Sequence, residues 1–145
     1  MKQPLTHSGQ CLCGMIRFEI AGPLEPVQIC HCAQCRRAQG TPFASNIPVK
    51  SADISWLSGQ DHLSRYESSP GKCRYFCPTC GSPVYSSRDS LPDVIRLRAG
   101  LLDNPVASQP LAHFYTGSKA SWWTISDGLP QFEAAYIPPP QTKDD

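Results

Sequence analysis

The sequence predicts an all-β domain of short strands, and two observations support that prediction. The chain of 145 residues contains 15 prolines and 10 glycines, so turns recur too often for long helices. Between the turns lie short segments in which apolar and polar residues alternate with a period of two, as on strands with one buried face. Because the length fits one domain and no internal repeat is visible, we expect a single core.

The expected strands follow in chain order. Residues 15–20 alternate, which places Ile16, Phe18 and Ile20 on one face. A second strand over 27–30 carries a cysteine at its end, and one helical turn is expected over 33–39. Further strands, the last with its arginines facing outward, are expected at 43–49, 54–57, 63–67, 72–76, 83–86 and 94–99.

After Gly100 the alternation weakens. Residues 113–115 and 121–125 form aromatic islands among turns, and residues 138–145 have the composition of a disordered tail. Trp122 and Trp123 are expected to be buried in the small β core rather than to wall a pocket.

Composition excludes several classes of protein. A net charge of +1 with 17% charged residues provides no broad field for nucleic acid or an anionic membrane. No apolar run approaches the ~18 residues of a membrane span, and the N-terminal residues lack the apolar region of a signal peptide. We therefore expect a cytoplasmic protein with reduced thiols, which makes four disulfides the weaker interpretation of the eight cysteines.

Seven of those cysteines fall into three closely spaced motifs. Structural zinc takes four protein ligands, whereas catalytic zinc takes three and leaves one position for water or substrate. One complete set of four thiolates and one set that is a ligand short therefore predict two zinc ions per chain with different roles. The motifs are CxC at Cys11 and Cys13, CxCxxC at Cys30, Cys32 and Cys35, and CxxC at Cys77 and Cys80.

The CxxC motif, followed by Gly81, is typical of a zinc knuckle. We expect Cys77 and Cys80 to share a structural zinc with Cys11 and Cys13, because structural zinc favours four cysteines. Such a site joins the first strand to the middle of the chain. Its binding free energy, ~10–16 kcal/mol in zinc-finger peptides, would act as folding free energy.

The central cluster of Cys30, Cys32 and Cys35 is expected to hold the reactive zinc, with the first two cysteines on one strand face. A substrate thiol could bind at the remaining position and be activated as a thiolate. The strand pleat would point His31 away from the cysteines, and the ligand count favours this open site. In the alternative, a closed site, the fourth ligand would be Cys73, His31, His62 or His113.

The ordered cysteine motifs resemble those of the glutathione-dependent formaldehyde-activating enzyme family, which includes the centromere-protein-V-like proteins. Cys73 is not part of the family pattern. The resemblance implies a zinc domain over residues 9–132, an N-terminal extension at 1–8 and a partly disordered tail at 133–145. The segments that carry it are 9–14, 30–36, 74–81, 117–123 and 127–130.

Fold and activity follow from the resemblance as expectations. It implies a β-tent of packed antiparallel sheets stapled by zinc, with a structural zinc on Cys11, Cys13, Cys77 and Cys80 and a reactive zinc on the central cluster. The implied activity is that of a carbon–sulfur lyase acting on a glutathione-type thiol adduct such as S-hydroxymethyl-glutathione. The implied partner is therefore a small-molecule thiol.

Two other functions stay open at this point. A non-catalytic zinc-binding interaction module would have two closed zinc sites. A redox or thiol-transfer role would be marked by a disulfide between Cys32 and Cys35.

Arg36 and Arg37 directly follow the central cluster and could hold the carboxylates of a glutathione-like ligand. A solvated basic surface is the alternative, with equal weight. His31 or a metal-bound water is the only general base that the sequence offers. The remaining polar candidates are Ser45 and Asn46 near the pocket, and Lys119 and Asp127 as surface or capping groups.

Overall fold

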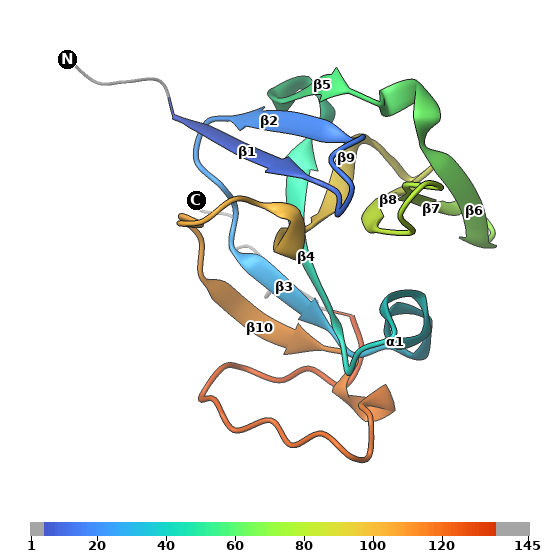
Figure 1. Cartoon of the computed structure of the whole chain (residues 1–145). Helices are drawn as coiled ribbons and strands as arrows, with labels where there is room; N and C mark the ends of the chain where they lie inside the picture. The colour runs from blue at the N-terminus through green and yellow to red at the C-terminus, as the bar shows by residue number, and fades with distance from the viewer. Residues whose placement is uncertain (1–4, 136–145) are drawn as a thin grey trace, which may run out of the picture.

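The computed structural model describes residues 5–135 and contains a small and a large β-sheet (Figure 1). The small sheet has the strand order β1-β2-β5, formed by Thr6–Gln10, Arg17–Ala21 and Ile54–Ser58. The large sheet has the order β10-β3-β4-β9-β8-β7-β6. Its strands in chain order are β3 Val27–Cys30, β4 Ala44–Lys50, β6 Ser64–Ser69, β7 Lys72–Phe76, β8 Pro83–Arg88, β9 Leu91–Arg98 and β10 Pro110–Phe114.

Helical structure is confined to short segments, so the all-β prediction is confirmed. The α-helix α1, Ala33–Gln39, begins after Cys32 and ends at Gly40, whose left-handed backbone (φ 68°) terminates it. No helix within residues 5–135 is both long and apolar enough to cross a membrane. Single turns of 3₁₀-helix occur at Ser51–Asp53, Gln60–His62, Ala99–Leu101 and Thr116–Ser118.

Two strands lie where the sequence pattern indicates none. β1 begins at Thr6, inside the segment expected to precede the domain, and pairs antiparallel with all of β2. β10 lies in the region described above as aromatic islands and pairs in parallel with β3, whereas the other strand pairs are antiparallel. Both strands are specified by their partners, since neither THSGQ nor PLAHF alternates clearly.

The core lies between the two sheets. Ile16, Phe18 and Ile20 are buried on one face, as their alternation predicts, and pack with buried residues of β4, β8 and β9. Gly9 of β1 lies directly over Phe18, because a Cβ at this position would be 2.5 Å from Phe18 Cζ. The close approach of β1 to the core therefore requires glycine there. The expected tail at 133–145 falls mostly outside the described residues.

Candidate metal centres and the adjoining cavity

The first thiol cluster joins two turns that are distant in the sequence. Cys11 and Cys13 follow β1, Cys77 and Cys80 lie between β7 and β8, and all four Sγ atoms lie within 4.8 Å of one another. Gly81, with φ 81°, lets the chain leave the knuckle and donates its N–H to the Cys77 carbonyl at 2.7 Å. The four cysteines predicted to share a structural zinc are therefore brought together.

Sulfur spacing in this cluster suits zinc. Cys13 Sγ lies 3.7 Å from Cys11 Sγ and 3.8 Å from Cys77 Sγ. Four sulfurs placed tetrahedrally at ~2.3 Å from one zinc ion are separated by about 3.8 Å. A hydrogen bond with the Ser82 hydroxyl, 3.2 Å away, lowers the pKa of Cys80 to about 5, which favours the thiolate that ligates metal.

The second cluster is local. Cys30 ends β3, Cys32 caps the N-terminus of α1, and Cys35 lies in the first turn of α1 and donates its N–H to Cys32 Sγ at 3.2 Å. Their three sulfurs lie within 4.8 Å of one another. The expectation that Cys30 and Cys32 share a strand face is wrong, because the strand has ended before Cys32 and the helix cap provides the convergence instead.

No fourth cysteine, histidine, aspartate or glutamate of residues 5–135 joins this cluster within the same distance. Cys73 lies on β7, and its sulfur is 3.9 Å from Arg65 Nη1. His62 contacts the Thr79 hydroxyl at 2.7 Å, beside the other cluster. In the described chain, the residues proposed to close the site thus have other partners.

The charge state of the second cluster is set by its own close sulfurs. Hydrogen bonds from Cys30 and Cys32, followed by the nearby Arg74 guanidinium, hold the pKa of Cys35 well below its usual range. Arg74 Nη2 lies 3.9 Å from Cys35 Sγ. Cys35 is therefore a thiolate near neutral pH, the form in which cysteine binds metal.

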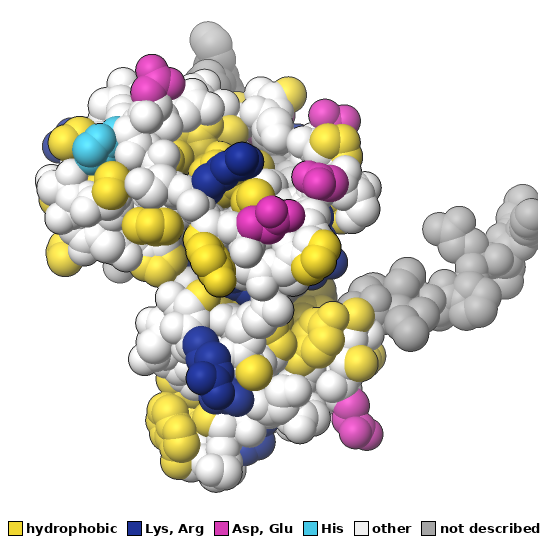
Figure 2. Space-filling model, turned by 90° about the vertical axis from the view of Figure 1, so that its right-hand side faces the viewer, with side chains coloured by type: hydrophobic (Ala, Val, Ile, Leu, Met, Phe, Trp, Pro, Cys, Tyr) yellow, Lys and Arg dark blue, Asp and Glu magenta, His cyan; other side chains and the backbone are white. Residues whose placement is uncertain are grey.

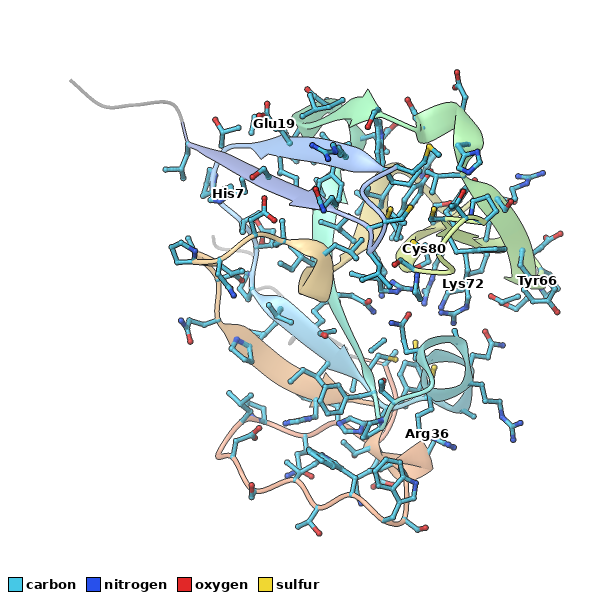
Figure 3. All side chains as sticks on the ribbon, in the orientation of Figure 1. His7, Glu19, Arg36, Tyr66, Lys72 and Cys80 are labelled. Atoms are coloured by element: carbon cyan, nitrogen blue, oxygen red, sulfur yellow. The ribbon has the colours of Figure 1, made fainter. Side chains whose placement is uncertain are left out.

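A cavity of about 860 Å³ opens beside the second cluster. Cys30, Cys32 and Cys35 line one side, and β7, β8 and β9 provide Lys72, Arg88 and Arg96 on the other. Figure 3 shows Lys72 on the side of β7 that faces α1. Figure 2 views the side of the molecule that lies on the right in Figure 1. In this view the outline narrows between the part built on β6–β8 and the part that contains α1.

Arg36 and Arg37 lie outside this cavity, which favours the alternative of a basic surface over the carboxylate-binding role. The Arg36 Nε–H donates to the Ser118 carbonyl at 3.1 Å, and Figure 3 shows Arg36 on the side of α1 that faces away from Lys72. Arg37 is exposed, and neither residue lines the cavity. Of the weaker polar candidates, Asn46 lines this cavity, whereas Ser45 lies on the opposite face of β4 beside a smaller cavity.

The arginines of β9 were expected to face outward, so the cations on β7, β8 and β9 were not predicted to be site residues. Arg98 is only 5% exposed, and its guanidinium donates to Asn46, Ser86 and Gln39 at 2.7–3.4 Å. Neither face of the sheet is turned to bulk solvent here. The core packs on one face, and α1 lies across the cavity from the other, so Arg96 and Arg98 face inward. Pairs of cations two residues apart, at 72 and 74 and at 96 and 98, were the available signal.

A hydrogen-bonded chain of two buried histidines and the exposed Asp127 supports the loop of the second cluster. His31 Nε2 lies 2.8 Å from His113 Nδ1, and His113 Nε2 lies 3.0 Å from both carboxylate oxygens of Asp127. The acceptor Asp127 selects the tautomer in which His113 Nε2–H donates, so His113 Nδ1 accepts from His31 Nε2–H. Asp127 also accepts the Leu129 N–H, as expected of a capping group.

His31 is fully buried, and that burial lowers the pKa of its imidazole to about 4. Neutral His31 does not line the cavity. Its position therefore suits support of the flanking cysteines better than proton transfer to a ligand. Trp122 and Trp123, expected in the core, are 70% and 39% exposed instead, on the loop that carries Asp127.

The chain is similar to known proteins over most of the described residues. A family model described as glutathione-dependent formaldehyde-activating enzyme matches residues 6–118. A protein of Schizosaccharomyces pombe named an uncharacterised lyase is 28% identical over 79 residues, and the matched segment spans about half of each protein, 54% of this chain and 56% of the relative. A crystal structure of a Rhodobacter sphaeroides protein superposes with a TM-score of 0.57 and 26% identity, covering 71% of this chain and 97% of that one.

Proposed function

This chain belongs to the glutathione-dependent formaldehyde-activating enzyme family, and on that basis we propose that it is a zinc-dependent carbon–sulfur lyase acting on a glutathione-type thiol adduct such as S-hydroxymethyl-glutathione. The name of the S. pombe relative, a lyase, supports this reaction class. The observation that carries the proposal is the cluster of three thiols that lines a cavity and has no fourth donor within residues 5–135.

Each cluster has a distinct role in this proposal. Cys11, Cys13, Cys77 and Cys80 would hold a structural zinc, and the second cluster would hold a reactive zinc, so that each chain binds two ions. When bound, zinc at the second cluster supplies a Lewis acid that lowers the pKa of a substrate thiol.

The reaction forms or breaks one carbon–sulfur bond. In the forming direction the thiol sulfur attacks the carbonyl carbon, the C=O π bond opens, the S–H proton ends on the carbonyl oxygen, and a hemithioacetal (an S-hydroxymethyl thiol for formaldehyde) results. Cys30 and Cys32, with Arg74 nearby, favour the thiolate form of Cys35, and α1 fixes Cys35 relative to Cys32 through the N-cap hydrogen bond. The cavity volume falls within the 300–1,000 Å³ typical of small-molecule sites.

Cobalt substitution tests the proposal. In the cobalt-loaded protein, added glutathione should increase the thiolate-to-metal charge-transfer band, and the protein should accelerate exchange between glutathione plus formaldehyde and their adduct, followed by NMR. Cys32→Ser should abolish both effects, whereas the matched control Cys73→Ser should retain them because Cys73 lies outside both clusters. If glutathione leaves the charge-transfer band unchanged and the protein does not accelerate the exchange, the interaction module with closed sites would be favoured.

A further inference from the structure

One face of the large sheet carries five cationic side chains. The strand register places Lys72 opposite Arg88, and Ser86 between Arg74 on one side and Arg96 on the other. Arg98 follows on the same face of β9, opposite Asn46 of β4. This face of β7, β8 and β9 is turned toward the cavity and the second thiol cluster.

Among the residues that the structure describes, no carboxylate pairs with any of these five cations. Within residues 5–135, none of them lies within 4.0 Å of a carboxylate, and the one ion pair of that region joins His113 to Asp127. Arg74 is only 8% exposed, and its Nη1 has no hydrogen-bond acceptor; the buried Nε of Arg88 also has none. Cys35, favoured as a thiolate and 3.9 Å from Arg74 Nη2, offsets part of this charge. Buried cations in excess of their counter-charges are costly, so an anionic ligand would stabilise this face.

Electrostatics point in the same direction. Burial, followed by repulsion from Arg74, lowers the pKa of Lys72, and burial, followed by repulsion from Arg88, lowers the pKa of Arg96. Bound anions on this face would relieve both effects. Of the described residues that line the cavity, Asp89 alone carries a carboxylate, and it is exposed at the rim.

The arrangement of the three lining cations favours carboxylates. Lys72, Arg88 and Arg96 stand on three adjacent strands, which lie ~4.8 Å apart in a sheet. Such spacing suits separate carboxylate groups, each of which a guanidinium can bind with two hydrogen bonds. A single phosphate needs donors that converge on one point, whereas these three side chains come from three separate strands.

We propose that Lys72, Arg88 and Arg96 form a carboxylate subsite that selects thiol adducts bearing carboxylates. The inference rests on the proposed function, because the cluster of Cys30, Cys32 and Cys35 on the opposite wall would hold the sulfur of the same ligand. The carboxylates could come from the thiol, as in glutathione, or from the carbonyl compound, as in an oxo acid.

Thiol binding to the cobalt-loaded protein tests the subsite. Glutathione, its diethyl ester and 2-mercaptoethanol are titrated against wild type, Arg96→Gln, Arg88→Gln and the control Arg37→Gln, whose side chain is exposed and outside the cavity. Loss of one charged hydrogen-bonding partner should weaken glutathione binding about 10- to 100-fold in the first two variants. Ester and mercaptoethanol binding should not change, and Arg37→Gln should bind like wild type.

A second arm identifies the source of the carboxylate. Adduct formation is compared for glyoxylate and its methyl ester, each with the glutathione ester as thiol. A preference for free glyoxylate that Arg96→Gln and Arg88→Gln remove would support the subsite with the carbonyl compound as the source. Thermal melts establish that each variant is folded, and Lys72→Met replaces any variant that is not.

Equal binding of all three thiols in wild type, with no preference for glyoxylate, would overturn the subsite while leaving the open metal position intact. A preference for carboxylate-bearing ligands that Arg37→Gln removes, but Arg88→Gln and Arg96→Gln do not, would also overturn the subsite. It would place carboxylate binding on α1. If no thiol, mercaptoethanol included, alters the cobalt spectrum, both the subsite and the proposed function fail.

Discussion

Cys77→Ser should unfold the protein, because it opens the cluster that links distant parts of the chain. Cys13 and Cys77 are 64 residues apart, whereas the second cluster spans only residues 30–35. By the loop-closure relation, cross-linking costs the unfolded chain about 4 kcal/mol of entropy in the first case and about 2 kcal/mol in the second. The linked zinc-binding energy of ~10–16 kcal/mol is as large as the whole stability of a typical domain, about 5–15 kcal/mol.

Circular dichroism melts and metal analysis of purified Cys77→Ser provide the assay, with Cys73→Ser as the matched control on the preceding strand. The control should melt like wild type and keep its metal, since Cys73 belongs to neither cluster. A cooperative, wild-type melt of Cys77→Ser with one metal lost would refute the structural role of the first cluster.

Three further predictions concern the second cluster, the core and the buried histidine chain. Cys32→Ser should remain folded and contain one metal fewer than wild type, because its cluster closes only a short loop; metal analysis beside a thermal melt decides this, and complete unfolding would contradict it. Phe18→Ala should cost about 3–5 kcal/mol in urea unfolding, because Phe18 is fully buried under β1; a loss below about 1 kcal/mol would mean that the sheets pack elsewhere. Asp127→Ala should remove the acceptor of His113 Nε2–H, changing the histidine tautomers in long-range ¹⁵N spectra and weakening metal retention at the second cluster; unchanged spectra would exclude the hydrogen-bonded chain.

The parts of this structure that the sequence predicts well are those set by neighbouring residues. CxC and CxxC spacings bring the sulfurs of each motif together within a single turn. The meeting of the two distant pairs was predicted from the preference of structural zinc for four cysteines. The alternation of Ile16, Phe18 and Ile20 likewise identifies the core face of β2, because one strand suffices to define it.

What the sequence could not predict depends on pairing between distant segments. Lys72, Arg88 and Arg96 face one cavity only because β7, β8 and β9 adopt a particular register. β1 is a polar segment that becomes a strand through its partner β2, with Gly9 fitted over Phe18. His113 and Asp127 reach His31 through β10, a strand whose parallel partner no local pattern indicates.

Cadmium-113 NMR of the metal-exchanged protein distinguishes an open from a closed second site, because the chemical shift of the metal reports its donor set. Two unlike sites should give two resonances, one for four sulfur donors and one for three sulfurs with a lighter donor. Glutathione should move only the second resonance toward the four-sulfur region, and Cys32→Ser should lack that resonance. Two resonances that both lie in the four-sulfur region and do not respond to glutathione would contradict an open, thiol-binding metal.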